Sequence, residues 1–94
     1  MRDLGLGLGE VAIERVEHAA KARDMLREHV AAGDLERCGS VAHSLKSMSL
    51  NIGASEVAGI AATFEQMARN DGKVPTESEL GALSQALDRA LMAL

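Results

Sequence analysis

A chain of 94 residues has room for one domain, and hydrophobic residues at 47% with aromatic residues at only 1% favour helices over sheets. A formal net charge of −4 argues against a nucleic-acid-binding face, and no apolar run approaches the roughly 20 residues of a membrane span. The single cysteine, Cys38, cannot form an internal disulfide and suits a reducing compartment. We therefore expect an all-α domain in the cytoplasm.

Residues 1–9 are expected to form a flexible leader. Glycine alternates with leucine from Leu4 to Gly9, and glycine at every second position disfavours both a helix and a packed strand. A phosphate-binding loop is a weaker interpretation, because no strand precedes these glycines and no lysine follows them at the required spacing. The folded domain is accordingly expected to span residues 10–94.

Four amphipathic helices are expected to follow the leader, over residues 10–32, 35–51, 55–69 and 76–94. Gly33 ends the first helix and Asp34 caps the second, which stops before Gly53. A loop over residues 70–75 leads to a capping box formed by Thr76 and Glu79. Helices joined by such short connections favour an antiparallel up-down four-helix bundle.

Apolar residues recur at helical spacing and are expected to form the core. The predicted stripes comprise Ile13, Val16, Ala20, Leu26 and Val30 on the first helix, Val57, Ile60, Ala61, Phe64, Met67 and Ala68 on the third, and Leu80, Leu83, Leu87, Ala90, Leu91 and Leu94 on the fourth. The methionines other than Met1 are also expected to fill the core.

The second expected helix turns a histidine away from its core side. At about 100° per residue, one narrow arc faces the core and contains Cys38, Val41, Leu45, Met48 and Ile52. His43 lies about 170° from the centre of that arc and therefore faces solvent. Small or apolar residues surround it, namely Gly39, Ser40, Ser47 and Leu50. We interpret this surface as one on which a large partner docks.

These residues suit a nucleophilic histidine. A neutral imidazole can attack phosphorus, and Lys46 can neutralise charge on the phosphoryl oxygens. Gly39 is expected to be exposed, where a glycine costs a helix about 0.5–1 kcal/mol relative to alanine, so a functional reason for it is favoured. The plainer interpretation is that His43 is simply one of the many histidines found on protein surfaces.

The segment Ala42–Ala54 resembles the signature of histidine-containing phosphotransfer (HPt) domains. That signature has the form Ala-His-x-Leu-Lys-Gly followed by a Gly-Ala pair, and the histidine, leucine, lysine and Gly-Ala pair agree in spacing here. The resemblance covers about residues 25–70. It implies a four-helix bundle that accepts a phosphoryl group on His43 from a receiver-domain aspartyl phosphate and passes it to another receiver aspartate.

The same resemblance implies roles for individual residues. His43 would be the phosphoacceptor, Lys46 its charge partner, and Glu65 the third-helix residue that hydrogen-bonds the imidazole. A carboxylate that accepts from Nδ1 would leave Nε2 free to attack. Helical spacing supports an ion pair between Glu65 and Arg69 equally well. Ser47 departs from the glycine usual in the family, which leaves the choice of partner open.

The resemblance also implies partners and cofactors. The expected partners are response-regulator receiver domains, with a hybrid histidine kinase as a further candidate, and the chain is expected to act as a monomer. It would bind no cofactor, whereas the partner receiver domain would hold Mg²⁺. Without that partner the chain would have no catalysis of its own.

Three other interpretations compete with this one. A histidine-kinase dimerisation domain, which would use ATP, usually has an acidic residue directly after its histidine, whereas Ser44 stands here. A metal site is not expected, because His18 and His29 are about 16 Å apart along one helix. A non-catalytic helical adaptor that binds a partner through the face around His43 is the alternative function.

Overall fold

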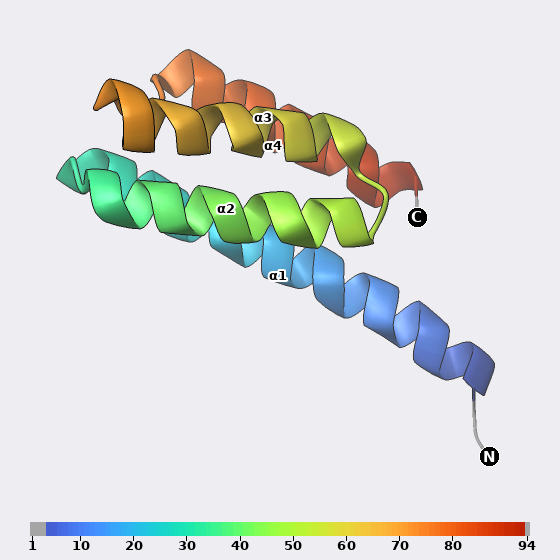
Figure 1. The fold of residues 1–94 in the computed structure, drawn as a ribbon. Coiled ribbons are helices and arrows are strands. Elements are labelled where there is room, and N and C mark those ends of the chain that lie inside the picture. Colours follow the sequence, from blue (N-terminus) through green and yellow to red (C-terminus); the bar gives the residue numbers. More distant parts are fainter. Residues whose placement is uncertain (1–3, 94) are drawn as a thin grey trace.

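The computed structural model describes the backbone of residues 4–93, together with the side chains of Glu14, residues 17–90 and Met92. Its helices are α1 (Leu4–Ala32), α2 (Leu35–Asn51), α3 (Ser55–Gln66) and α4 (Glu77–Ala93). Successive helices run antiparallel, and α2 lies between α1 and α3 while α4 packs against α1 and α3 (Figure 1). The prediction of an all-α four-helix bundle is confirmed for the described part of the chain.

Helix α1 begins earlier than the sequence predicted. It already includes Leu4, so the prediction that the glycine–leucine repeat is non-helical is wrong for residues 4–9, while residues 1–3 lie outside the described residues. Extending an existing helix avoids the cost of nucleation, so these glycines lengthen a helix that has already formed rather than having to start one. The early part of α1 extends past the end of α2 (Figure 1). Neither α1 nor another described helix is long and apolar enough to cross a membrane.

Caps define the predicted boundaries between helices. Gly33 ends α1 in the left-handed region with φ of 69°, and Asp34 accepts a hydrogen bond from the backbone nitrogen of Arg37 at 3.1 Å. At the start of α4, the backbone nitrogen of Thr76 donates to Oε1 of Glu79 at 2.8 Å, and that of Glu79 donates to Oγ1 of Thr76 at 3.2 Å. The predicted N-cap and capping box are therefore both confirmed.

The third helix does not end as predicted. Helix α3 passes at Met67 into a π-helical turn, η1 (Met67–Asp71), in which the backbone bonds reach five residues back. Gly72 closes it with φ of 62° and donates to the carbonyl oxygen of Met67. The predicted loop over residues 70–75 therefore lies over residues 72–76 instead. The π-helical turn continues the helical surface of α3 and carries Arg69 beside α2.

Leucine and alanine build most of the core. The largest buried side chains are Leu26, Leu45, Leu80, Leu83 and Leu87, and burying a leucine stabilises a fold by about 1.5–3 kcal/mol. The predicted stripes are buried or half-buried wherever their side chains are described. The predicted stripe residues whose side chains lie outside the described set are Ile13, Val16, Leu91 and Leu94.

The prediction that the methionines fill the core is only partly right. Met48 and Met67 are half-buried and pack against the core. Met25 is 46% exposed and Met92 is 87% exposed, so the prediction is wrong for these two. Helical spacing identifies an apolar position, but whether a neighbouring helix covers it depends on the tertiary packing.

Candidate functional site

His43 lies near the middle of α2, on the side turned away from the core. The adjacent Ala42 and the nearby Leu45 are fully buried, and these two residues set the rotation of the helix. Residues on a helix are about 100° apart, so burying those two turns His43 outward. Its side chain is 53% exposed, which makes the ring accessible from outside the bundle.

Glu65 of α3 lies beside this ring. Its Oε2 atom is 3.0 Å from Nδ1 of His43, and its side chain is only 13% exposed. An ionised carboxylate can only accept a hydrogen bond, so Nδ1 carries the hydrogen and the lone pair of a neutral ring is on Nε2. The contact thus selects the tautomer whose outer nitrogen can act as a nucleophile.

Two cations share the same carboxylate. Nζ of Lys46 donates to Oε1 of Glu65 at 3.1 Å, and Nη1 of Arg69 lies 2.6 Å from Oε2. The sequence left two interpretations of Glu65 open, and in the structure the residue contacts both His43 and Arg69 through one oxygen. The three charged residues also line a shallow polar hollow of about 310 Å³ on the surface.

The charges around Glu65 keep it ionised. Burial alone would raise the pKa of this carboxyl group, but the hydrogen bond and charge of Lys46, the charge of Arg69 and the contact with His43 outweigh it. The pKa of Glu65 is therefore lowered from its ordinary value of 4.5. One carboxylate and two cations leave the group with a net positive charge beside the imidazole. Such a group favours an anion near the ring.

Gly39 does not have the open surroundings that the sequence predicted. It is buried, because the side chain of Arg69 lies across it from the neighbouring helix. A Cβ atom on Gly39 would lie only 3.1 Å from both Cγ and Nε of Arg69. The prediction that Gly39 is exposed is therefore wrong, because spacing along α2 does not reveal which side chain of a neighbouring helix covers it.

The other residues predicted to dock a partner are exposed. Ser40 and Ser47 lie on the surface of α2, and Leu50 is 61% exposed. Both Leu50 and Ser47 follow His43 along α2, within about 11 Å along the helix axis. An apolar side chain this exposed near an accessible histidine is available for contact with a partner.

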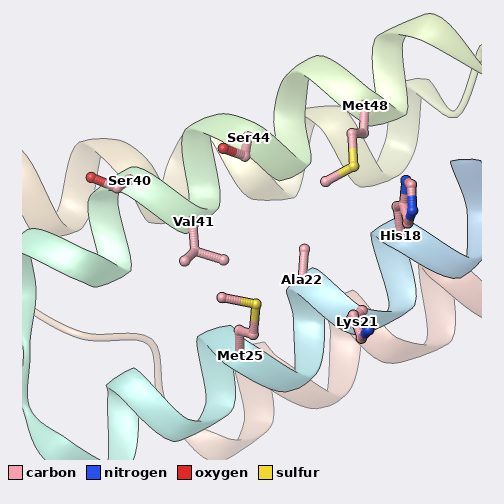
Figure 2. A pocket seen from close by; sticks show the side chains of 8 residues that line it. All are labelled: His18, Lys21, Ala22, Met25, Ser40, Val41, Ser44 and Met48. Atoms are coloured by element: carbon pink, nitrogen blue, oxygen red, sulfur yellow. The ribbon is translucent and has the colours of Figure 1, made fainter.

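A groove that the sequence did not predict lies between α1 and α2. It has a volume of about 370 Å³, and Figure 2 shows Met25, Val41 and Met48 pointing into it. Its remaining lining residues are His18, Lys21, Ala22, Ser40 and Ser44. Ser44 directly follows His43 on α2, and Ser40 precedes it by three residues, so the groove opens near the histidine. The groove could not be predicted from the sequence, because it depends on how α1 pairs with α2. In the structure, the exposed side chain of Met25 marks its position.

The remaining reactive side chains form no second centre in the described part of the molecule. Cys38 is buried, and burial together with the charge of Asp34 raises the pKa of its thiol, which disfavours the nucleophilic thiolate. Among the described residues, no group of three or more histidine, cysteine, aspartate or glutamate side chains could hold a metal ion.

Comparison with protein families identifies a match over most of the chain. Residues 11–93, which include most of α1 and all of the other helices, match the Hpt domain family. Hpt domains act in histidine phosphotransfer within phosphorelays and interact with receiver and kinase domains. Comparison with curated proteins and with solved structures finds no match.

Proposed function

Because this chain belongs to the Hpt domain family, we propose that it is a phosphorelay intermediate whose phosphoacceptor is His43. In this proposal, His43 takes a phosphoryl group from a receiver-domain aspartyl phosphate and passes it to the aspartate of another receiver. The observation that carries the proposal is the contact between Nδ1 of the exposed His43 and Oε2 of Glu65 at 3.0 Å. It leaves Nε2 as the free nucleophile on an accessible surface.

The transfer step follows from this arrangement. The lone pair on Nε2 of His43 attacks phosphorus, the bond between phosphorus and the aspartate oxygen breaks, and the aspartate leaves as a carboxylate. Attack by a neutral imidazole leaves positive charge on the ring, which the carboxylate of Glu65 stabilises through the hydrogen on Nδ1. The reverse reaction with a second receiver returns Nε2 to its neutral state.

Lys46 has the second role in this proposal. Its ammonium group donates to the carboxylate of Glu65, which also contacts the imidazole of His43. The ammonium carries a charge opposite to that of the phosphoryl oxygens. It therefore lowers the energy of the transition state and of the phosphohistidine. The receiver domain is proposed to hold the Mg²⁺ that completes the neutralisation, and this chain is proposed to have no catalysis without it.

The surface around His43 is the proposed docking site for the receiver. It combines Ser40, Ser47 and Leu50 on α2 with the groove between α1 and α2. Small serines allow another protein to approach the ring closely, and exposed apolar side chains gain free energy when a partner covers them. We expect the chain to meet one receiver at a time, in the cytoplasm, as a monomer.

The proposal is tested by incubating the chain with a receiver domain that carries a labelled phosphoryl group. Label on the wild type should be lost in acid and kept in base, as a phosphohistidine requires. The His43→Gln variant should fold, as judged by circular dichroism, but take up no label. As a matched control, His29→Gln changes a half-buried histidine on α1 that does not line the groove and should keep phosphoryl uptake.

Two outcomes would overturn the proposal. One is label that survives acid, and the other is label that persists in His43→Gln. If the chain binds receivers but neither the wild type nor the variant takes up label, the alternative of a non-catalytic helical adaptor is supported instead.

A further inference from the structure

The contact between Gly39 and Arg69 plays no part in the transfer chemistry described above. Arg69 extends from η1 across α2, and its Cγ and Nε atoms occupy the space that a side chain on residue 39 would need. Because Gly39 lies inside a helix, it lowers helix stability relative to alanine. No unusual backbone angle requires a glycine here, since its φ is not positive. The structure therefore explains the glycine at residue 39 by its contact with Arg69, which leaves no room for a side chain there.

The antiparallel register of α2 and α3 explains why this contact lies beside the site. Gly39 precedes His43 by one helical turn, and Arg69 follows Glu65 by one helical turn. When two helices run in opposite directions, a pair of facing residues is followed one turn away by another facing pair. The pair of Gly39 and Arg69 thus lies directly next to the pair of His43 and Glu65.

Arg69 acts on the carboxylate oxygen that faces the imidazole. Its Nη1 atom contacts Oε2 of Glu65, which is also the oxygen next to Nδ1 of His43, whereas Lys46 contacts Oε1. With one cation on each oxygen, the carboxylate has a defined rotation about its terminal bond. Removing the cation on Oε2 would leave Lys46 alone to orient the group and would allow Oε2 to turn away from the ring.

We propose that Gly39 and Arg69 are positioning residues of the phosphotransfer site. The missing side chain at residue 39 lets the Arg69 stem lie against α2, and the guanidinium then holds Oε2 of Glu65 against Nδ1 of His43. The guanidinium does this although the Arg69 side chain is 51% exposed, because packing of its stem on Gly39 restricts its rotamers. The inference rests on the proposed function in that Nε2 is taken as the attacking atom.

The test places a methyl group in the space that Arg69 occupies. Gly39→Ala is compared with the wild type, both alone and in an Arg69→Gln background. Gly59→Ala is the matched control, because Gly59 is an exposed glycine inside α3 and no described atom outside its own helical surroundings lies within 4 Å of a Cβ there. Two quantities are measured. One is the fraction of neutral His43 rings that carry their hydrogen on Nδ1, from ring ¹⁵N shifts at neutral pH. The other is the rate of phosphoryl uptake from a receiver.

Gly39→Ala should reduce the Nδ1–H fraction and slow uptake about two- to fivefold, the range that corresponds to loss of an exposed charge contact. Arg69→Gln should do the same, and adding Gly39→Ala to it should cause no further change. Arg69→Lys should restore part of the uptake rate, because it keeps the charge but lacks the planar guanidinium. Gly59→Ala should leave both quantities at the wild-type value.

The inference is overturned if Gly39→Ala has the wild-type tautomer ratio. It is also overturned if Gly39→Ala slows uptake equally in the Arg69→Gln background, since the methyl group would then obstruct the receiver directly. Failure of the proposed function is a separate result, because it appears as label that persists in His43→Gln. The tautomer measurement needs no phosphoryl transfer and decides the positioning role in either case.

Discussion

Nδ1 of His43 and Oε2 of Glu65 lie 3.0 Å apart, although the two residues are separated by 22 positions in the sequence. The contact joins the exposed side of α2 to a largely covered side chain of α3. Because Glu65 also contacts Lys46 and Arg69, it is both the acceptor that fixes the imidazole and the centre of a small charge network. Substitutions of Glu65 and of its partners can separate these two roles.

Replacing Glu65 separates its hydrogen bond from its charge. Glu65→Ala removes both and should slow phosphoryl uptake about fivefold, the factor that corresponds to a hydrogen bond worth about 1 kcal/mol. Glu65→Gln keeps an oxygen that can accept from Nδ1 and should slow uptake less. The rates are measured by label transfer from a phosphorylated receiver. Equal rates for Glu65→Ala and the wild type would show that the carboxylate does not orient the ring during transfer.

Lys46→Ala should shorten the lifetime of the phosphorylated protein and slow its formation. Loss of a cation beside the phosphoryl oxygens is expected to change each rate by about tenfold, or about 1.4 kcal/mol. Hydrolysis of purified phosphoprotein and uptake from the receiver are the two measurements. Lys73→Ala is the control, because it removes an exposed lysine from the loop between η1 and α4. A similar change in both variants would attribute the effect to overall charge.

Which parts of the site could be predicted depended on whether they lie on one helix or between helices. His43 and Lys46 are three residues apart on α2, so helical spacing alone predicts that they lie near each other. The place of Glu65 beside them depends on the register of α3 against α2, which periodicity leaves open. The predicted exposure of Gly39 is wrong for the same reason, since Arg69, which covers it, belongs to η1.

The fold shows a similar division. Asp34, Thr76 and Glu79 act through contacts with residues close to them in the sequence, so their caps could be predicted. The early start of α1 could not, because local glycine content says little about extension of a helix that packing elsewhere has already nucleated. The groove between α1 and α2 also depends on tertiary packing. For the same reason, the sequence could not show that Met25 is exposed.

Glu65 should make stability depend on pH in the acidic range. Its pKa is lowered in the folded chain, so the unfolded chain binds more protons as the pH falls through the range below the ordinary value of 4.5. The stabilisation is complete above that ordinary value and is lost as the pH falls through the lowered one. Glu65→Gln should therefore be less stable than the wild type at neutral pH, by no more than about 1 kcal/mol because the paired cations are partly exposed.

Urea unfolding at a series of pH values measures this difference. The gap between wild type and Glu65→Gln should close as the pH falls below the lowered pKa of Glu65. Glu28→Gln, which changes an exposed carboxylate on α1, serves as the control for a general charge effect. A gap that stays constant from neutral to strongly acidic pH would contradict the ion-pair assignment.

The capping box should make a measurable contribution to stability without affecting the site. Thr76→Ala removes the hydroxyl that accepts from the backbone of Glu79, and it should lower the free energy of unfolding by about 1 kcal/mol. Thr63→Ala is the matched control, since Thr63 is an exposed threonine inside α3 and alanine is the better helix former there. It should be neutral or slightly stabilising. Urea unfolding gives both values, and phosphoryl uptake should stay unchanged in Thr76→Ala.

Docking and chemistry can be separated with two phosphoryl donors. Leu50→Glu and Met25→Glu place a charge on exposed apolar positions of α2 and α1, and each should weaken receiver binding by at least about tenfold, since covering such a side chain is worth about 1.5–3 kcal/mol. Uptake from a receiver at low concentration should fall by the same factor. Uptake from a small phosphoramidate donor, which needs no docking surface, should stay at the wild-type rate.

Met92→Glu is the control for these two variants, because Met92 is 87% exposed but belongs to α4, which does not pack against α2. It should leave uptake from both donors unchanged. If Leu50→Glu and Met25→Glu slow both donors equally, the substitutions disturb His43 itself and the proposed docking surface is wrong. If only Leu50→Glu weakens binding, the receiver contacts α2 beyond His43, and the groove lined by Met25 lies outside its footprint.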